Sequence, residues 1–182
     1  MAGTLYVVAT PIGNLEDITL RALRILRTCD LIAAEDTRRT HNLLASHGLS
    51  TRCVSYHLHN SRSRLPQLVS RLEQGLNIGL VSDAGTPGIS DPGLELVRAC
   101  VEKGISVEPI PGPSAPLTAL SVSGFPSEPF TFFGFTPNKS RARTEWFQRV
   151  FQVEHTFCFL EAPHRIQDTL QQACRFSGER QI

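Results

Sequence analysis

Short apolar runs alternate with longer amphipathic stretches over residues 1–122. The runs at residues 4–9, 30–34, 53–56, 78–81 and 105–110 have the length and composition of buried strands. Each run is followed by a segment whose apolar residues recur at helical spacing, as after the cap-forming Thr19. This alternation predicts an α/β fold in which a five-stranded, mostly parallel sheet is flanked by helices on both faces.

A segment rich in proline, glycine and serine interrupts this pattern at residues 123–129. It predicts a linker between an N-terminal α/β domain, residues 1–122, and a second domain. Two more apolar runs follow, at residues 130–135 and 156–160, and each precedes a helical pattern. The sequence therefore predicts a further, smaller α/β domain over residues 130–182.

Composition excludes several classes of protein. Of the 182 residues, 41% are hydrophobic, which is enough for a packed core. Eighteen basic residues against 17 acidic ones leave a net charge of +1, so a uniformly basic nucleic-acid coat is excluded but a local basic face is not. The five cysteines form no CxxC pair and have no histidine at ligand spacing. We therefore expect no metal site and reduced thiols in a cytosolic protein, and the apolar runs predict neither a signal peptide nor a membrane span.

Polar and conformationally special residues gather at the carboxyl ends of the five predicted strands. Right-handed crossovers would place all of these ends on one edge of the sheet. Packing alone does not explain such a concentration, so we interpret this edge as a ligand site. The residues are Pro11 and Gly13; Glu35, Asp36 and Arg38; His57 and Asn60; Asp83, Gly85 and Pro87; and Pro111, Gly112 and Ser114.

The stretch at residues 77–93 is the most unusual part of this edge. A short buried strand runs into a loop rich in glycine, proline and acid. Asp91 is the expected N-cap of the next helix and Pro92 its first residue. The glycines allow the backbone to approach a ligand, and Asp83 ends the strand where it would meet one. The alternative is a tight turn, organised by the Asp83 carboxylate, that binds nothing.

Familiar catalytic motifs do not appear. The first strand is not followed by GxGxxG, and the sequence has neither a P-loop nor a GxSxG serine. Glu35 and Asp36 lie about where dinucleotide folds place a ribose-binding acid. His57 and His59 can share one side of an extended segment, although structural histidines are the simpler interpretation. The basic pairs and clusters suit either a phosphate backbone or a solvated surface.

Six motifs occur together in one order and closely resemble a known family. They span residues 10–15, 35–38, 57–60, 80–93, 111–115 and 161–165. The chain is similar, over essentially its whole length, to the ribose 2′-O-methyltransferases that modify a cytidine of small-subunit ribosomal RNA. That family belongs to the tetrapyrrole (corrin/porphyrin) methylase superfamily.

The resemblance implies a two-domain, cytoplasmic methyltransferase that is usually a homodimer, with S-adenosylmethionine folded in the cleft between the domains. It implies roles for three groups of residues. The expected cofactor-binding residues are Pro11, Gly13, Asp83, Ala84, Gly85, Pro87, Ile89, Ser114, Ala115, Leu160 and Glu161. The expected RNA-binding residues are Arg38, Arg39, Asn60, Arg62, Lys139, Arg141 and Arg143. The candidate catalytic bases are Asp36 and Asp83, followed by Glu35 and His57.

The chain departs from the family pattern in two ways. Ser61 stands where members often carry an acid. Members also continue past the point where this sequence stops, so we expect the second domain to be incomplete and to leave an unpaired sheet edge. Two other functions therefore stay open: a methyltransferase of a tetrapyrrole or other small molecule, and a non-catalytic fragment that binds cofactor or RNA. The sequence leaves open which nucleotide is modified.

Overall fold

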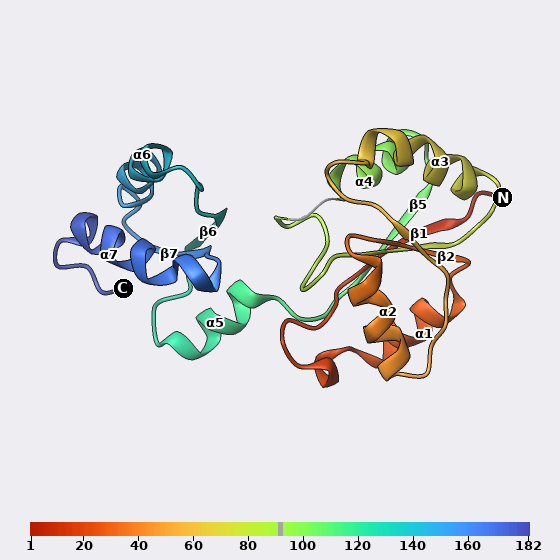
Figure 1. Cartoon of the computed structure of the whole chain (residues 1–182), viewed down its shortest axis with the longest axis horizontal. Coiled ribbons are helices and arrows are strands. Elements are labelled where there is room, and N and C mark those ends of the chain that lie inside the picture. The colour runs from red at the N-terminus through yellow and green to blue at the C-terminus, as the bar shows by residue number, and fades with distance from the viewer. Residues whose placement is uncertain (91–92) are drawn as a thin grey trace. The chain divides into compact units, whose positions relative to one another are not determined.

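The computed structural model describes residues 1–90 and 93–182, and it divides into two compact units, Met1–Ala115 and Pro116–Ile182 (Figure 1). The first unit contains five strands that pair in parallel in the order β3-β2-β4-β1-β5. This arrangement confirms the predicted parallel sheet. The strands are β1 (Thr4–Val8), β2 (Leu31–Ala34), β3 (Cys53–Ser55), β4 (Ile78–Val81) and β5 (Ser106–Ile110).

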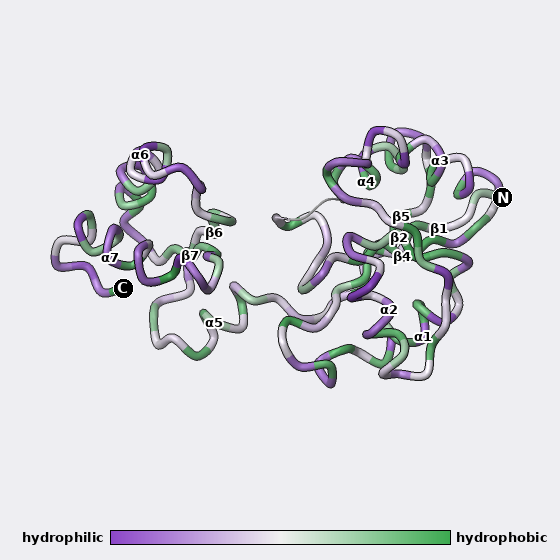
Figure 2. Tube along the Cα trace, in the orientation of Figure 1, coloured by the Kyte–Doolittle hydropathy of each residue, from purple (hydrophilic) through white to green (hydrophobic). Residues whose placement is uncertain are grey.

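Helices cover both faces of this sheet. On one face, α1 (Leu20–Thr28) and α2 (Thr37–Ser46) pack against the sheet and contribute Leu26 and Leu44 to the core. On the other face, α3 (Ser61–Glu73) and α4 (Leu94–Glu102) contribute Leu72 and Leu96 to a second core. Figure 1 shows the two pairs on opposite sides of the strands. Because β2 and β4 are buried at every residue, they need the continuous apolar sequence that predicted them, which is green in Figure 2.

A side-chain cap explains where α1 begins. The Thr19 hydroxyl accepts a hydrogen bond from the Ala22 N–H at 3.0 Å, which confirms the predicted start of α1. A short 3₁₀ turn, η1 (Leu15–Asp17), precedes it and is capped by Asn14. The predicted cap at Asp91 and Pro92 lies outside the described residues, and α4 begins at Leu94 after Gly93.

The second unit is a small α/β layer. Its strands β6 (Phe130–Phe135) and β7 (Thr156–Leu160) pair in parallel. Beside them, α6 (Ser140–Val150) and α7 (Ile166–Ser177) contribute Trp146, Phe147 and Ala173 to an aromatic core. The remaining elements are α5 (Ala115–Ser123) and the 3₁₀ turn η2 (Pro163–Arg165). The second α/β segment is therefore confirmed, whereas its predicted boundary at residues 123–129 stays a prediction.

Candidate functional site

The order of the strands selects one place on the first unit for a ligand. Strand β4 lies between β1 and β2, yet α1 and α2 pack on one face of the sheet and α4 on the other. The loop after β4 therefore runs to one face of the sheet, while the loops after its neighbours β1 and β2 run to the opposite face. In open α/β sheets this divergence opens a crevice outside the carboxyl ends of the strands, where ligands bind. The loop after β4, residues 82–90, lies at that point.

Hydrogen bonds fix the β4 loop to the loop after β1. The Thr10 N–H donates to the Gly85 carbonyl at 2.9 Å, and the Gly85 N–H donates back to the Thr10 carbonyl at 3.0 Å. The Thr10 hydroxyl also donates to the Ser82 carbonyl at 3.1 Å. Thr10 and Ser82 are buried, so these bonds are shielded from water. The loop is consequently held in shape before any ligand binds.

Gly85 is where three loops meet. Its φ of +81° is a conformation that glycine adopts without strain. A Cβ atom built on it would lie 3.7 Å from Ile12 Cγ2 and 3.9 Å from the Pro113 carbonyl oxygen. The loops after β1, β4 and β5 thus converge on this glycine, as the sequence predicted for Pro11, Gly85 and Ser114.

Two carboxylates join the loops after β2 and β4. The Asp83 N–H donates to Glu35 Oε2 at 3.2 Å, and the Asp36 N–H donates to Asp83 Oδ1 at 3.0 Å. Each loop therefore supplies a carboxylate that holds the backbone of the other. The structure brings all three predicted acidic residues into one corner of the sheet edge.

Asp36 is already fully engaged by Arg38. Its Oδ1 accepts from the Arg38 N–H at 2.8 Å and from Nε at 3.1 Å, and its Oδ2 accepts from Nη2 at 2.7 Å. Hydrogen bonds from the Arg38 side chain and then its backbone lower the pKa of Asp36 to about 2. A carboxylate with so low a pKa is a weak general base near neutral pH. In the structure, the Asp36 carboxylate caps the N-terminus of α2 by accepting the Arg38 N–H.

Asp83 uses only one of its two carboxylate oxygens to accept a hydrogen bond from the backbone of the neighbouring loop. While Oδ1 holds the Asp36 N–H, Oδ2 lies 3.4 Å from Arg39 Nη1. A pocket of about 200 Å³ adjoins it between the β1 loop, α2 and the β4 loop. The residues lining the pocket are Thr10, Pro11, Leu15, Arg39, Thr40, Asn42, Leu43, Ser82 and Asp83.

The loop after β3 is organised by Asn60. Its Oδ1 accepts from the His57 N–H at 2.9 Å, and its Nδ2 donates to Ser55 Oγ at 2.7 Å. The Tyr56 N–H bonds to the Ala34 carbonyl at 2.7 Å, which places this loop beside the loop after β2. His57 Nδ1 is buried and has no hydrogen-bond partner among the described residues. The Asn60 amide thus shapes the loop. The Tyr56 hydroxyl and His57 Nδ1 are its buried polar atoms without a hydrogen-bond partner among the described residues.

In the second unit, the Glu161 carboxylate is buried and accepts hydrogen bonds from several neighbours. Its side chain is only 1% exposed and accepts from Thr169 Oγ1 and the Ala162 N–H, each at 2.7 Å, and also from Thr136 and Arg165. Burial alone would raise the pKa of Glu161, but these donors together hold it below its usual value. The network occupies the carboxylate that the resemblance assigns to the cofactor.

Arg143 belongs to the same network. Its Nε donates to Gln172 Oε1 at 2.8 Å and its Nη1 to Thr169 Oγ1 at 3.3 Å, and the residue is 7% exposed. A buried guanidinium cannot reach an RNA backbone, so we leave Arg143 out of the RNA surface. Lys139 and Arg141 are exposed and remain available, as are Arg38 and Arg39 in the first unit.

Some site residues escape sequence reasoning. The paired backbone bonds of Thr10 and the hydroxyl of Ser82 depend on strands that are distant in sequence, and no local pattern shows them. Arg39, Asn42 and Leu43 follow helical spacing of three and four residues, so they share one face of α2. That spacing could have identified the pocket wall once the start of α2 was known.

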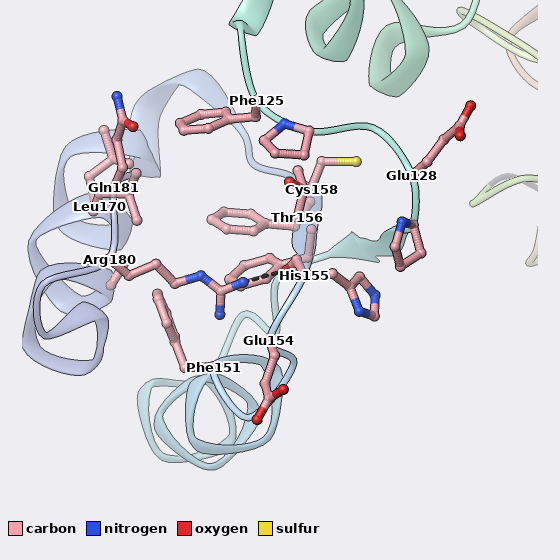
Figure 3. A pocket seen from close by; sticks show the side chains of 16 residues that line it. Phe125, Glu128, Phe151, Glu154, His155, Thr156, Cys158, Leu170, Arg180 and Gln181 are labelled. Atoms are coloured by element: carbon pink, nitrogen blue, oxygen red, sulfur yellow. Dashed lines mark hydrogen bonds between the residues drawn. The ribbon is translucent and has the colours of Figure 1, made fainter.

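A larger pocket of about 480 Å³ lies wholly within the second unit (Figure 3). It is bounded by the segment around Phe125, by β7, by Leu170 of α7 and by Arg180, whose guanidinium lies 4.9 Å from the centre of the Phe157 ring. Its lining contains none of the predicted site residues. Among the described residues, no group of three or more histidine, cysteine, aspartate or glutamate residues could hold a metal, and no helix is long and apolar enough to span a membrane.

Comparison with known proteins is consistent with this geometry. The Tetrapyrrole (Corrin/Porphyrin) Methylases match residues 4–181. A Halalkalibacterium halodurans protein named Ribosomal RNA small subunit methyltransferase I is 49% identical over 99% of the chain and 62% of its own length. The Vibrio cholerae protein of that name is 50% identical over 100% and 63%. The chain therefore spans less than two thirds of these relatives. The structure of a conserved hypothetical protein from Aeropyrum pernix K1 shares the fold, with a TM-score of 0.76, 19% identity and coverage of 99% and 67%.

Proposed function

The chain belongs to the tetrapyrrole (corrin/porphyrin) methylase family, and from this premise we propose that it acts in methyl transfer from S-adenosylmethionine to a ribose 2′-hydroxyl. The acceptor is a cytidine of small-subunit ribosomal RNA. The observation that carries the proposal is the identity of 49–50%, over 99–100% of the chain, to proteins named Ribosomal RNA small subunit methyltransferase I. Such a substrate would place the protein in the cytoplasm, and a homodimer is part of the same proposal.

The first unit offers a fitting cradle for the cofactor. Gly85 leaves the space that a Cβ would fill between Ile12 and Pro113, so backbone can approach a bound molecule there. Thr10 holds this loop in place through paired backbone bonds. When bound, S-adenosylmethionine supplies an electrophilic methyl group on a sulfonium. We assign its binding to Pro11, Gly13, Asp83, Ala84, Gly85, Pro87, Ile89, Ser114 and Ala115, while Leu160 and Glu161 stay predictions.

The chain must also orient the hydroxyl and accept its proton. Positioning of the two reactants supplies much of the rate in such displacements, on the order of several kcal/mol. Among the candidate bases, Asp36 is disfavoured because Arg38 occupies both of its oxygens. Asp83, Glu35 and His57 remain candidates, and Asp83 is the one that lines the small pocket.

Exposed basic side chains on the first unit suit the phosphate backbone of RNA. The Arg38 and Arg39 side chains are 88% and 68% exposed, and Arg62 is also exposed. Phosphate contacts of this kind position RNA without reading its sequence. Arginine also binds carboxylates such as those of tetrapyrroles, so the preference for RNA over the second candidate substrate rests on the named relatives.

A labelled-methyl transfer assay tests the proposal. The chain is incubated with methyl-labelled S-adenosylmethionine and either small ribosomal subunits or a free tetrapyrrole. We expect label in the RNA and none in the tetrapyrrole. Label in the tetrapyrrole alone would identify the other substrate class, and label in neither, with cofactor binding retained in calorimetry, would indicate a binding fragment.

A further inference from the structure

Strands β2 and β4 stop pairing through their backbones where the proposed cofactor loop begins. Their last paired residues are Ala34 and Val81. Beyond this pair the two chains separate, because the β2 loop enters α2 on one face of the sheet and the β4 loop leads to α4 on the other. Contacts between the two loops past this point therefore set the width of the crevice.

Two carboxylate side chains join the loops where the backbone pairing ends. The Asp83 N–H donates to Glu35 Oε2 at 3.2 Å, and the Asp36 N–H donates to Asp83 Oδ1 at 3.0 Å. The first bond holds the backbone that carries the Asp83 side chain, and the second uses that side chain to hold the β2 loop. The two bonds therefore act in series: Glu35 sets where Asp83 lies, and Asp83 sets where Asp36 lies.

We propose that Glu35 is a positioning residue, which places Asp83 and the start of the β4 loop, and that it is not the base that accepts the hydroxyl proton. Of the described residues, those that line the pocket of about 200 Å³ include Asp83 but not Glu35. Glu35 Oε2 is used on a backbone N–H instead. The inference deepens the proposed function and rests on it, because the loop that Glu35 places is the one to which we assign the cofactor.

A positioning role and a catalytic role make opposite demands on this side chain. Accepting the Asp83 N–H needs an oxygen at the right distance but does not need a charge. Glu35→Gln meets that need, whereas the side chain of Glu35→Asp is one methylene group too short. Accepting a proton from the substrate needs a carboxylate, so a base would be lost in Glu35→Gln. The two conservative variants therefore separate the two roles.

Amide hydrogen exchange, followed by NMR, tests the inference without cofactor or RNA. The Asp36 N–H is the informative group, because its partner is Asp83 and not Glu35. In Glu35→Asp and Glu35→Ala we expect the Asp83 and Asp36 amides to exchange about tenfold faster than in the parent chain, as for one lost hydrogen bond. In Glu35→Gln both amides should exchange as they do in the parent chain.

Cofactor affinity and turnover extend the test to the proposed reaction. Calorimetry should show an affinity for S-adenosylmethionine about tenfold lower in Glu35→Asp and nearly unchanged in Glu35→Gln. In the methyl-transfer assay Glu35→Gln should keep kcat within about threefold of the parent value, whereas loss of a general base commonly costs about a hundredfold or more. Glu73→Ala is the matched control, because it removes an exposed carboxylate of the same unit that pairs with Lys103 at 2.7 Å. It should change none of these measurements.

The variants also define what would overturn the inference. One such result is unchanged exchange of the Asp36 amide in both Glu35→Asp and Glu35→Ala. Another is a fall in kcat of about a hundredfold in Glu35→Gln while its amide exchange stays that of the parent chain. If Glu35→Ala does not fold, the comparison of Glu35→Gln with Glu35→Asp decides alone. A parent chain that neither binds the cofactor nor transfers methyl groups would contradict the proposed function, while the exchange results still decide the role of Glu35.

Discussion

The two units place polar side chains at equivalent positions and use them differently. In both units, acids and bases follow the carboxyl ends of parallel strands. At the end of β7, the Glu161 side chain is 1% exposed, and it accepts hydrogen bonds from Thr136, Thr169 and the Ala162 N–H and pairs with Arg165. At the end of β4, the Asp83 side chain is 28% exposed and lines a pocket. Position at the end of a strand therefore marks both acids as candidates, and the exposure of Asp83 favours it over Glu161 as the residue that binds a ligand.

Removing the buried acid should give the largest effect. We expect Glu161→Ala to destabilise the second unit by about 3 kcal/mol, because it leaves Arg165 without its carboxylate partner. Trp146 is the only tryptophan in the sequence and lies in the core of that unit, so its fluorescence in a urea titration reports this loss. A midpoint unchanged from that of the parent chain would show that the network does not hold the unit together.

The first unit should respond instead to a change in the loop after β4, which we propose binds the cofactor. Gly85→Ala forces a side chain into a φ of +81° next to Ile12 and Pro113. We expect strain of about 1–2 kcal/mol and a loss of affinity for S-adenosylmethionine of about tenfold, measured by calorimetry.

Gly104→Ala separates strain from binding. Gly104 has a similar φ of +66°, but a Cβ there would meet nothing within 4 Å. The Gly104→Ala variant should be less stable than the parent chain but bind S-adenosylmethionine with the same affinity. Equal affinity losses in the two variants would mean that Gly85 is a structural glycine.

Sequence reasoning predicted the frame of the first unit because burial on both faces demands continuous apolar strands. It also predicted which loops meet, since parallel strands end on one edge. It could not distinguish Asp83 from Glu161, since both are acids at strand ends. The difference lies in Thr136, Thr169 and Arg165, which reach Glu161 only through tertiary packing. The same holds for Arg143, whose basic cluster looks exposed in sequence but whose guanidinium is buried.

The pH response of Asp36 gives a smaller and local effect. Its pKa is lowered from 3.8 to about 2 by Arg38. Any stability that this carboxylate contributes is therefore present above its ordinary pKa and is lost as the pH falls towards 2. In Arg38→Gln we expect the NMR titration midpoint of Asp36 to return towards 3.8. A midpoint that stays near 2 would assign the shift to the α2 N-terminus instead.

The smallest effect should come from an exposed pair in the second unit. Arg141 Nε lies 3.0 Å from Glu145 Oε1, with the two side chains 93% and 61% exposed. Glu145→Ala should change the free energy of unfolding by less than about 0.5 kcal/mol, because exposed pairs of this kind are weak. The Trp146 urea titration measures it alongside Glu161→Ala. A loss comparable to that of Glu161→Ala would mean that burial does not separate the two kinds of acid.

The location of the cofactor is the most direct test of the whole account. Backbone amide NMR of the chain is recorded as S-adenosylmethionine is added. We expect the amides of Thr10, Asp83 and Gly85 to shift in proportion to bound cofactor, while that of Gly104, the control position in the same unit, stays in place. Shifts confined to the second unit, or no shifts at saturating cofactor, would contradict it.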